Sequence, residues 1–113
     1  GFYDAYYTRA QKVRSLVAGD FARAFEKVDL IAGPTAPAPA PLLGVAASDH
    51  LQTYLADIYT IPANLAGLPG ISVPCGTAAD GDDLLPVGPQ FLAPHFREET
   101  LISAGYVLEQ SIK

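Results

Sequence analysis

The chain has one cysteine, Cys75, among its 113 residues. A lone cysteine cannot form an internal disulfide bond, so nothing in the sequence indicates an oxidising compartment. Long apolar runs are also missing, since no stretch approaches the roughly 18 consecutive apolar residues that a membrane-spanning helix needs. The first residues lack the basic start and apolar run of a secretory signal. These absences predict a soluble cytoplasmic protein without membrane contact.

Basic residues are few. Seven Lys and Arg stand against twelve Asp and Glu, which gives a net charge of −5 and an isoelectric point near 4.7. Most of the basic residues fall in the first predicted helix, interleaved with acidic ones, as is typical of a solvated helix face. A nucleic-acid groove needs a concentrated basic surface. We therefore expect that this segment does not itself bind nucleic acid.

The short motifs of hydrolytic catalysis are absent as well. A Ser–His–acid site uses an exposed Gly-x-Ser-x-Gly turn, and no serine of this chain has those neighbours. A catalytic cysteine needs a nearby base, and neither His50 nor His95 stands in a recognisable cysteine-hydrolase pattern. We interpret Cys75 as a small buried apolar residue at a strand end, and Ser72 as structural. The acidic run at 80–83 lacks the ligand spacing of a calcium loop, so an exposed turn without metal is expected there.

The first half of the chain predicts one helix, one strand and an extended segment. Apolar residues recur at steps of three and four over residues 3–26, which predicts a long amphipathic helix. Gly19 weakens that helix by about 1 kcal/mol relative to alanine. The apolar run 28–32 predicts a buried strand. Prolines alternate with small residues over 34–41, and we expect extended surface chain there, in preference to an interdomain linker or an SH3 ligand.

The second half predicts three helices and two strands. Ser48 or Asp49 is expected to cap a helix that presents apolar residues up to Ile58. Pro62 suits a first helical turn and Gly67 a left-handed stop, which together predict a short helix. A strand covered on both faces is expected at 71–75, a further strand near 87–93, and a last helix at 97–112. Its core-facing residues would be Leu101, Ala104, Leu108 and Ile112. This order of elements predicts an α/β fold.

Several segments resemble a known family. Residues 60–76, TIPANLAGLPGISVPCG, resemble the C-terminal part of the amidase signature family. The opening GFYDAYYTRAQKVR, DLIAGPT at 29–35, YLAD at 54–57 and LPVG at 85–88 resemble one branch of it, the A-type subunits of glutamyl-tRNA(Gln) amidotransferases. Pro89 departs from the family pattern, which usually has an aliphatic residue in a strand. Proline has no N–H to donate to a neighbouring strand, so the sequence does not decide whether this position is paired in a sheet.

The resemblance implies a fold and an incomplete site. The family's catalytic residues form a Ser–cis-Ser–Lys triad in a Gly/Ser-rich segment, and this sequence has no such segment. Lys12, Lys27 and Lys113 match no triad position. We therefore expect residues 1–113 to be the incomplete C-terminal segment of an amidase domain, cut from a longer chain. Its sheet would be mixed and flanked by helices, and the segment alone would be inactive.

One residue is implied to contact substrate. In the A-type branch, the acidic residue at the position of Asp57 lies in the substrate pocket, where its carboxylate would bind the α-ammonium of glutamine. A hydrogen bond between charged groups is stronger than a neutral one. An arginine for the α-carboxylate would lie upstream of Gly1. The alternative interpretation of Asp57 is an exposed helix aspartate.

The implied function belongs to the longer protein. It would hydrolyse glutamine and pass ammonia to a partner subunit, which converts Glu-tRNA(Gln) to Gln-tRNA(Gln). B- and C-type subunits are the implied partners, with mischarged tRNA reached through the complex. ATP and Mg²⁺ would be used by the partner, and no cofactor is expected in this segment. Two alternatives are another carboxamide hydrolase of the family and a non-catalytic truncation that only binds partners.

Overall fold

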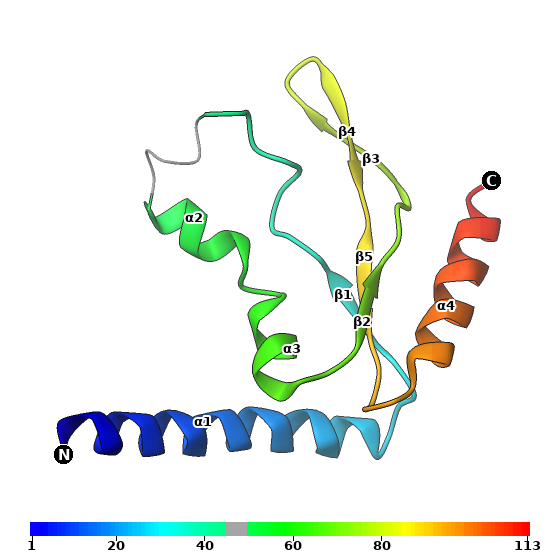
Figure 1. Ribbon diagram of the computed structural model, residues 1–113. Coiled ribbons are helices and arrows are strands. Elements are labelled where there is room, and N and C mark those ends of the chain that lie inside the picture. Colours follow the sequence, from blue (N-terminus) through cyan, green and yellow to red (C-terminus); the bar gives the residue numbers. More distant parts are fainter. Residues whose placement is uncertain (45–49) are drawn as a thin grey trace.

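The computed structural model describes residues 1–44 and 50–113, and Figure 1 shows a central group of strands with helices around it. The α/β class is confirmed. Helix α1 lies along one end of the strands, α2 and α3 on one side and α4 on the other. The elements in chain order are α1 (Phe2–Phe25), β1 (Ile31–Pro34), α2 (His50–Ala56), α3 (Ile61–Ala66), β2 (Gly70–Ser72), β3 (Gly76–Asp80), β4 (Asp83–Val87), β5 (Pro89–Leu92) and α4 (Glu98–Ser111).

Helix α1 confirms the long helix predicted from the apolar repeat, but only part of its apolar face is covered. Val17, Phe21 and Phe25 are half-buried, whereas Tyr3 is 77% exposed. The middle of the helix packs on α3. There the Arg14 Nε donates to the Leu65 carbonyl oxygen at 2.8 Å. A cation at the carboxyl end of a helix satisfies a free carbonyl and the helix dipole.

Strand β5 is the centre of a three-stranded antiparallel sheet in the order β1-β5-β2. Its residue Leu92 lies opposite Ile31 of β1 and Gly70 of β2. Helix α4 packs on β2 and β5. A Cβ built on Gly105 of α4 would lie 3.0 Å from Val73 Cγ2, so the glycine permits close helix–sheet contact. The buried apolar residues of the described chain gather here and at the end of α3: Ala66, Leu92, Ala93 and Leu101.

The two prolines of the sheet lie opposite each other. Strand β1 is Ile31–Pro34 and not the predicted 28–32, and Pro34 is paired with Pro89 at the first position of β5. Proline is tolerated at a strand's first residue, because the ladder there loses only one hydrogen bond, the one that the proline nitrogen cannot donate. The Pro89 carbonyl oxygen still accepts the Val73 N–H, at 3.4 Å. Pairing therefore begins at Pro89 and is not prevented by it.

A two-stranded ladder of β3 and β4 was missed by the sequence patterns. The predicted strand 71–75 ends at Ser72, and the chain pairs again from Gly76, with Gly76 opposite Val87. The acidic turn at 80–83 is exposed as predicted, and Gly81 has φ 62° there. Figure 1 shows this hairpin projecting away from α1. The covering on both faces predicted for the strand at 71–75 is not found in this chain, because Gly70 and Ser72 of β2 are exposed and Ile71 is half-buried.

The short helices agree with their local signals. Gly67 has φ 69° at the end of α3, and the Leu68 N–H bonds to the Ala63 carbonyl oxygen, as in a left-handed helix stop. The predicted caps Ser48 and Asp49 lie outside the described residues. Helix α4 begins and ends within one residue of its prediction. The prediction that Ile112 faces the core is wrong, since it is 48% exposed beyond the helix end.

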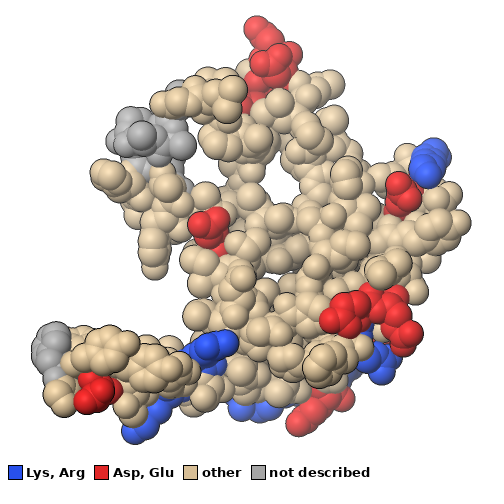
Figure 2. Space-filling model, viewed as in Figure 1, with Lys and Arg blue, Asp and Glu red and all other residues tan. Residues whose placement is uncertain are grey.

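The chain is open for its size. Its accessible surface is 8500 Å², against about 5,900 Å² for a compact monomer of 11.9 kDa. Its radius of gyration is 17.0 Å, against about 13 Å for a compact domain of this length. Large apolar side chains such as Leu43 and Phe96 are almost wholly exposed. Figure 2 shows a largely uncharged face, with acidic residues at the top and acidic and basic residues mixed along the lower edge. Within residues 1–44 and 50–113, no helix is both long and apolar enough to span a bilayer.

We expect the 113-residue chain by itself to be marginally stable and to self-associate. Strands β1 and β2 each have one edge that pairs with no described strand, and unpaired edges next to exposed apolar residues promote association. Thermal unfolding by circular dichroism, with light scattering, measures both properties. A cooperative transition of a monomer above about 65 °C would contradict the expectation.

Candidate functional site

The residues that sequence analysis considered as nucleophiles or bases are not brought together. Cys75 is half-buried between β2 and β3, where its N–H donates to the Val87 carbonyl oxygen at 2.9 Å. Lys12 lies on α1 and Lys27 just after it. Lys113 lies 3.9 Å from Glu109 across the end of α4. Among the described residues, none of these lysines hydrogen-bonds to a serine, so no Ser–Lys pair is formed.

Asp57 lies one residue beyond the helix on which it was predicted. Helix α2 ends at Ala56, and residues 57–60 form the turn that leads into α3. The Asp57 carbonyl oxygen accepts the N–H groups of Thr60 and Ile61, both at 3.0 Å. Its side chain is exposed and its carboxylate has no partner among the described residues. The backbone of Asp57 is thus held in a bonded turn while its carboxylate is free to bind a ligand.

Gln90 ties this turn to the sheet, a feature that sequence analysis did not single out. Its Nε2 donates to the Tyr59 carbonyl oxygen at 2.6 Å and to the Pro34 carbonyl oxygen at 3.1 Å. The available signal was a polar residue between Pro89 and Phe91 in an apolar strand. A half-buried amide in such a place needs partners of its own.

A small cavity lies between α3, strands β2 and β5, and Thr35, which directly follows β1. Its volume is about 280 Å³, and among the described residues no charged side chain lines it. The Thr35 Oγ1 donates to the Gly88 carbonyl oxygen at 2.9 Å and so accepts the hydroxyl of Ser72, also at 2.9 Å. This bond agrees with the structural role predicted for Ser72. Among the described residues that line it, the cavity has no acid or base. Its neutral hydrogen-bonding residues are Thr35, Thr60, Asn64, Ser72 and Gln90.

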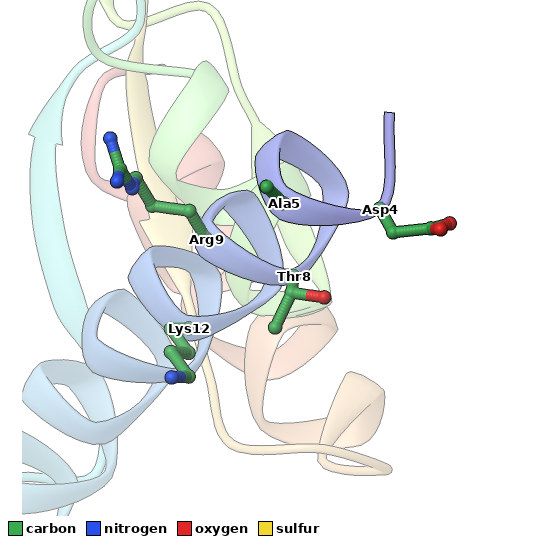
Figure 3. Close-up of a pocket in the computed structure, with 5 residues that line it drawn as sticks. All are labelled: Asp4, Ala5, Thr8, Arg9 and Lys12. Carbon is green, nitrogen blue, oxygen red and sulfur yellow. The ribbon is translucent and has the colours of Figure 1, made fainter. Parts of the chain in front are cut away.

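A second hollow runs along the exposed part of α1. Figure 3 shows that all five of its residues come from this one helix, with Asp4 and Arg9 pointing away from each other. A single helix provides no opposing wall that would enclose a ligand. Over the described part of the chain, no three His, Cys, Asp or Glu side chains are grouped closely enough to hold a metal ion. Asp57 and its anchored turn are therefore the best candidate for a contact with substrate.

Comparison with known proteins identifies the family. Residues 1–102 match the family model described as Amidase. The chain is 68% identical over 108 residues to the A-type subunit of the glutamyl-tRNA(Gln) amidotransferase from Akkermansia muciniphila, covering 96% of this chain and 23% of that protein. It is 54% identical over 112 residues to the protein of the same name from Koribacter versatilis, covering 99% of this chain and 23% of the relative. The chain thus spans less than a quarter of the length of these relatives.

Solved structures agree with this result. The crystal structure of the A-type subunit of the glutamyl-tRNA(Gln) amidotransferase from Thermotoga maritima superposes with a TM-score of 0.75 at 40% identity, over 88% of this chain and 21% of that one. The structure of 6-aminohexanoate cyclic dimer hydrolase gives a TM-score of 0.71 at 28% identity, over 84% of this chain and 22% of that one. The resemblance seen in the sequence is confirmed, and the chain belongs to the amidase family.

Proposed function

We propose that residues 1–113 are the C-terminal segment of an amidase domain in the A-type subunit of a glutamine-dependent amidotransferase, which acts in the cytoplasm. The full-length subunit hydrolyses glutamine and supplies ammonia for the conversion of Glu-tRNA(Gln) to Gln-tRNA(Gln). The observation that carries this proposal is the 68% identity to a protein named as such a subunit, over 96% of this chain. The nucleophile, the bridging serine and the lysine are supplied by the part of the subunit outside this segment.

Within this segment, Asp57 is proposed to hold the α-ammonium of glutamine. Its exposed carboxylate and its hydrogen-bonded turn support the assignment. A carboxylate held by rigid backbone loses little entropy when it binds a cation, and a charge-assisted hydrogen bond is stronger than a neutral one.

The remaining components belong to the complex. The proposed partners are B- and C-type subunits, and mischarged tRNA is reached through them. ATP and Mg²⁺ are used by a partner subunit to activate the glutamate on that tRNA. Because this segment has a net charge of −5, its surface is unfavourable for binding either ATP or tRNA, which are both negatively charged.

A second candidate function is hydrolysis of another carboxamide without a partner. The likeness to 6-aminohexanoate cyclic dimer hydrolase, at a TM-score of 0.71, favours it. An amidotransferase subunit is expected to release ammonia from glutamine mainly when its partner subunits are present. A free amidase is expected to release ammonia from simple carboxamides equally well with and without them.

The test is therefore ammonia release by the full-length subunit, measured with glutamine and with simple carboxamides, in the presence and absence of the partner subunits. Glutamine-specific release that rises with the partners supports the amidotransferase. Partner-independent turnover of simple carboxamides, without a preference for glutamine, would replace the proposal with the second candidate.

The 113-residue chain alone is expected to release no ammonia from glutamine. Removal of a whole catalytic unit leaves little beyond binding effects, and all three proposed triad residues lie outside this chain. The measurement compares the purified chain with a heat-inactivated sample. Turnover that survives repurification would show that the segment carries a nucleophile of its own.

A further inference from the structure

The turn that carries Asp57 is connected to the sheet through one side chain. We infer that Gln90 is a positioning residue for substrate binding, because its amide fixes the Asp57 turn relative to strands β1 and β5. This inference rests on the proposed role of Asp57 in holding glutamine. It assigns to Gln90 no contact with the substrate itself.

Two kinds of hydrogen bond hold the turn at residues 57–60: bonds within the turn and its neighbouring helix, and one bond from the sheet. Within the turn, the Thr60 N–H and Oγ1 donate to the Asp57 carbonyl oxygen at 3.0 and 3.3 Å, and the Asn64 Nδ2 donates to the Thr60 carbonyl oxygen at 2.9 Å. These bonds span three or four residues and keep the turn in shape. The bond from Gln90 to Tyr59 spans 31 residues. Among the described residues, it is the side-chain hydrogen bond that reaches the turn from the sheet.

The chemistry of the amide suits this role. Both hydrogens of Nε2 are used, one on the Tyr59 carbonyl of the turn and one on the Pro34 carbonyl at the end of β1. Gln90 itself is half-buried in central strand β5, opposite Ser72 and Gly33. An amide NH₂ has two donors, whereas an ionised carboxylate has none. A single group thus joins three segments that are distant in sequence.

The bonds within the turn pass this restraint on to Asp57. Tyr59 is two residues from Asp57, and the intervening chain is closed by the bonds of Thr60 and Ile61 to the Asp57 carbonyl. A shift at Tyr59 therefore moves the carboxylate as well. Small misplacements of positioned groups have large effects on binding and rate.

Two substitutions in the full-length subunit test the inference. Gln90→Met keeps the chain length and removes both donors, and Gln90→Glu places an oxygen against two carbonyl oxygens. With partner subunits present, Gln90→Met is expected to raise KM for glutamine by roughly 5- to 30-fold, with kcat less affected. Gln90→Glu is expected to raise it further. Activity with ammonium supplied directly should be retained by both. Gln110→Met on exposed α4 is the matched control and should leave all these values unchanged.

Coupling to Asp57 distinguishes positioning from general damage. In an Asp57→Ala background, Gln90→Met is expected to add only about 2-fold to KM, because residues that act through one another are not additive. Full additivity, or equal loss with glutamine and with ammonium, would show that Gln90 is merely structural. Normal KM in Gln90→Met together with raised KM in Asp57→Ala would overturn this inference and leave the proposed function intact.

Amide hydrogen exchange tests the anchoring without any assay of glutamine. The N–H groups of Thr60 and Ile61 should exchange faster in Gln90→Met than in Gln110→Met, because the turn has lost its bond to the sheet. If the full-length subunit proves not to use glutamine, the proposed function fails and this measurement still decides whether Gln90 holds the turn. Unchanged exchange would overturn the inference.

Discussion

Asp57→Ala in the full-length subunit is expected to raise KM for glutamine, or lower kcat/KM, by about 10- to 150-fold. The substitution removes a charge-assisted hydrogen bond to the substrate ammonium, and such a bond contributes roughly 1.5–3 kcal/mol. The turn itself should persist, because its bonds use the Asp57 carbonyl oxygen and not the carboxylate. Steady-state kinetics with glutamine in the assembled complex measure the effect.

Three comparisons make this prediction specific. Asp57→Asn should be nearly as poor as alanine, since it keeps an acceptor and loses the charge. Asp82→Ala removes another exposed carboxylate, at the β3–β4 turn, and should leave glutamine kinetics unchanged. Ammonium supplied directly bypasses the glutamine pocket, so that activity should survive in every variant. Normal glutamine kinetics in both Asp57 variants would mean that Asp57 is a surface residue only.

Gly88→Ala is expected to destabilise the full-length subunit by about 1–3 kcal/mol or to prevent its folding. A Cβ at this position would lie 2.4 Å from the Val73 carbonyl oxygen and 2.9 Å from the Val73 carbonyl carbon. These are backbone atoms between β2 and β3, so no side chain can rotate away to make room. The Gly88 carbonyl also accepts the hydroxyl of Thr35, and a backbone shift would break that bond. Thermal unfolding and soluble yield measure the loss.

Gly19→Ala is the matched control for this prediction. Gly19 lies inside α1, and a Cβ there would meet only the Nη1 of Arg23, at 3.5 Å. Because glycine disfavours a helix interior, alanine should be neutral or should stabilise the protein by up to about 1 kcal/mol. Equal stability of the Gly88 and Gly19 variants would show that β4 and β5 do not approach the Val73 backbone as closely as described.

The helices could be predicted from the sequence because their signals are local. The apolar repeat over 3–26 matches the spacing of successive helical turns. Helix α1 begins and ends within one residue of this range. Pro62 and Gly67 set the start and stop of α3 through their own backbone preferences. The acidic turn was found for the same reason, since Gly81 adopts a positive φ. The α/β class follows from the order of such elements.

The strands could not be placed as well, because pairing joins residues that are distant in sequence. No alternation of apolar and polar residues around Ala78 and Ala79 reveals strand β3. The strand is defined by its pairing with β4, where these residues lie opposite Leu85 and Leu84. Strand β1 lies at 31–34 and not at 28–32, because the residues that pair with β5 are Ile31 to Pro34 and an apolar run does not reveal a distant partner.

The sequence alone determined the family and the bounds of α1, α3 and α4, because these depend on residue identity and on contacts within a few residues. It also pointed to Asp57, through the resemblance to that family. Only the tertiary structure decided what holds Asp57 in place. Its turn is fixed by a glutamine 33 positions later, through a bond to Tyr59 that no local pattern encodes. The structure also showed that apolar strand faces are exposed in this chain. Burial depends on which segments pack together, and composition carries no information about that.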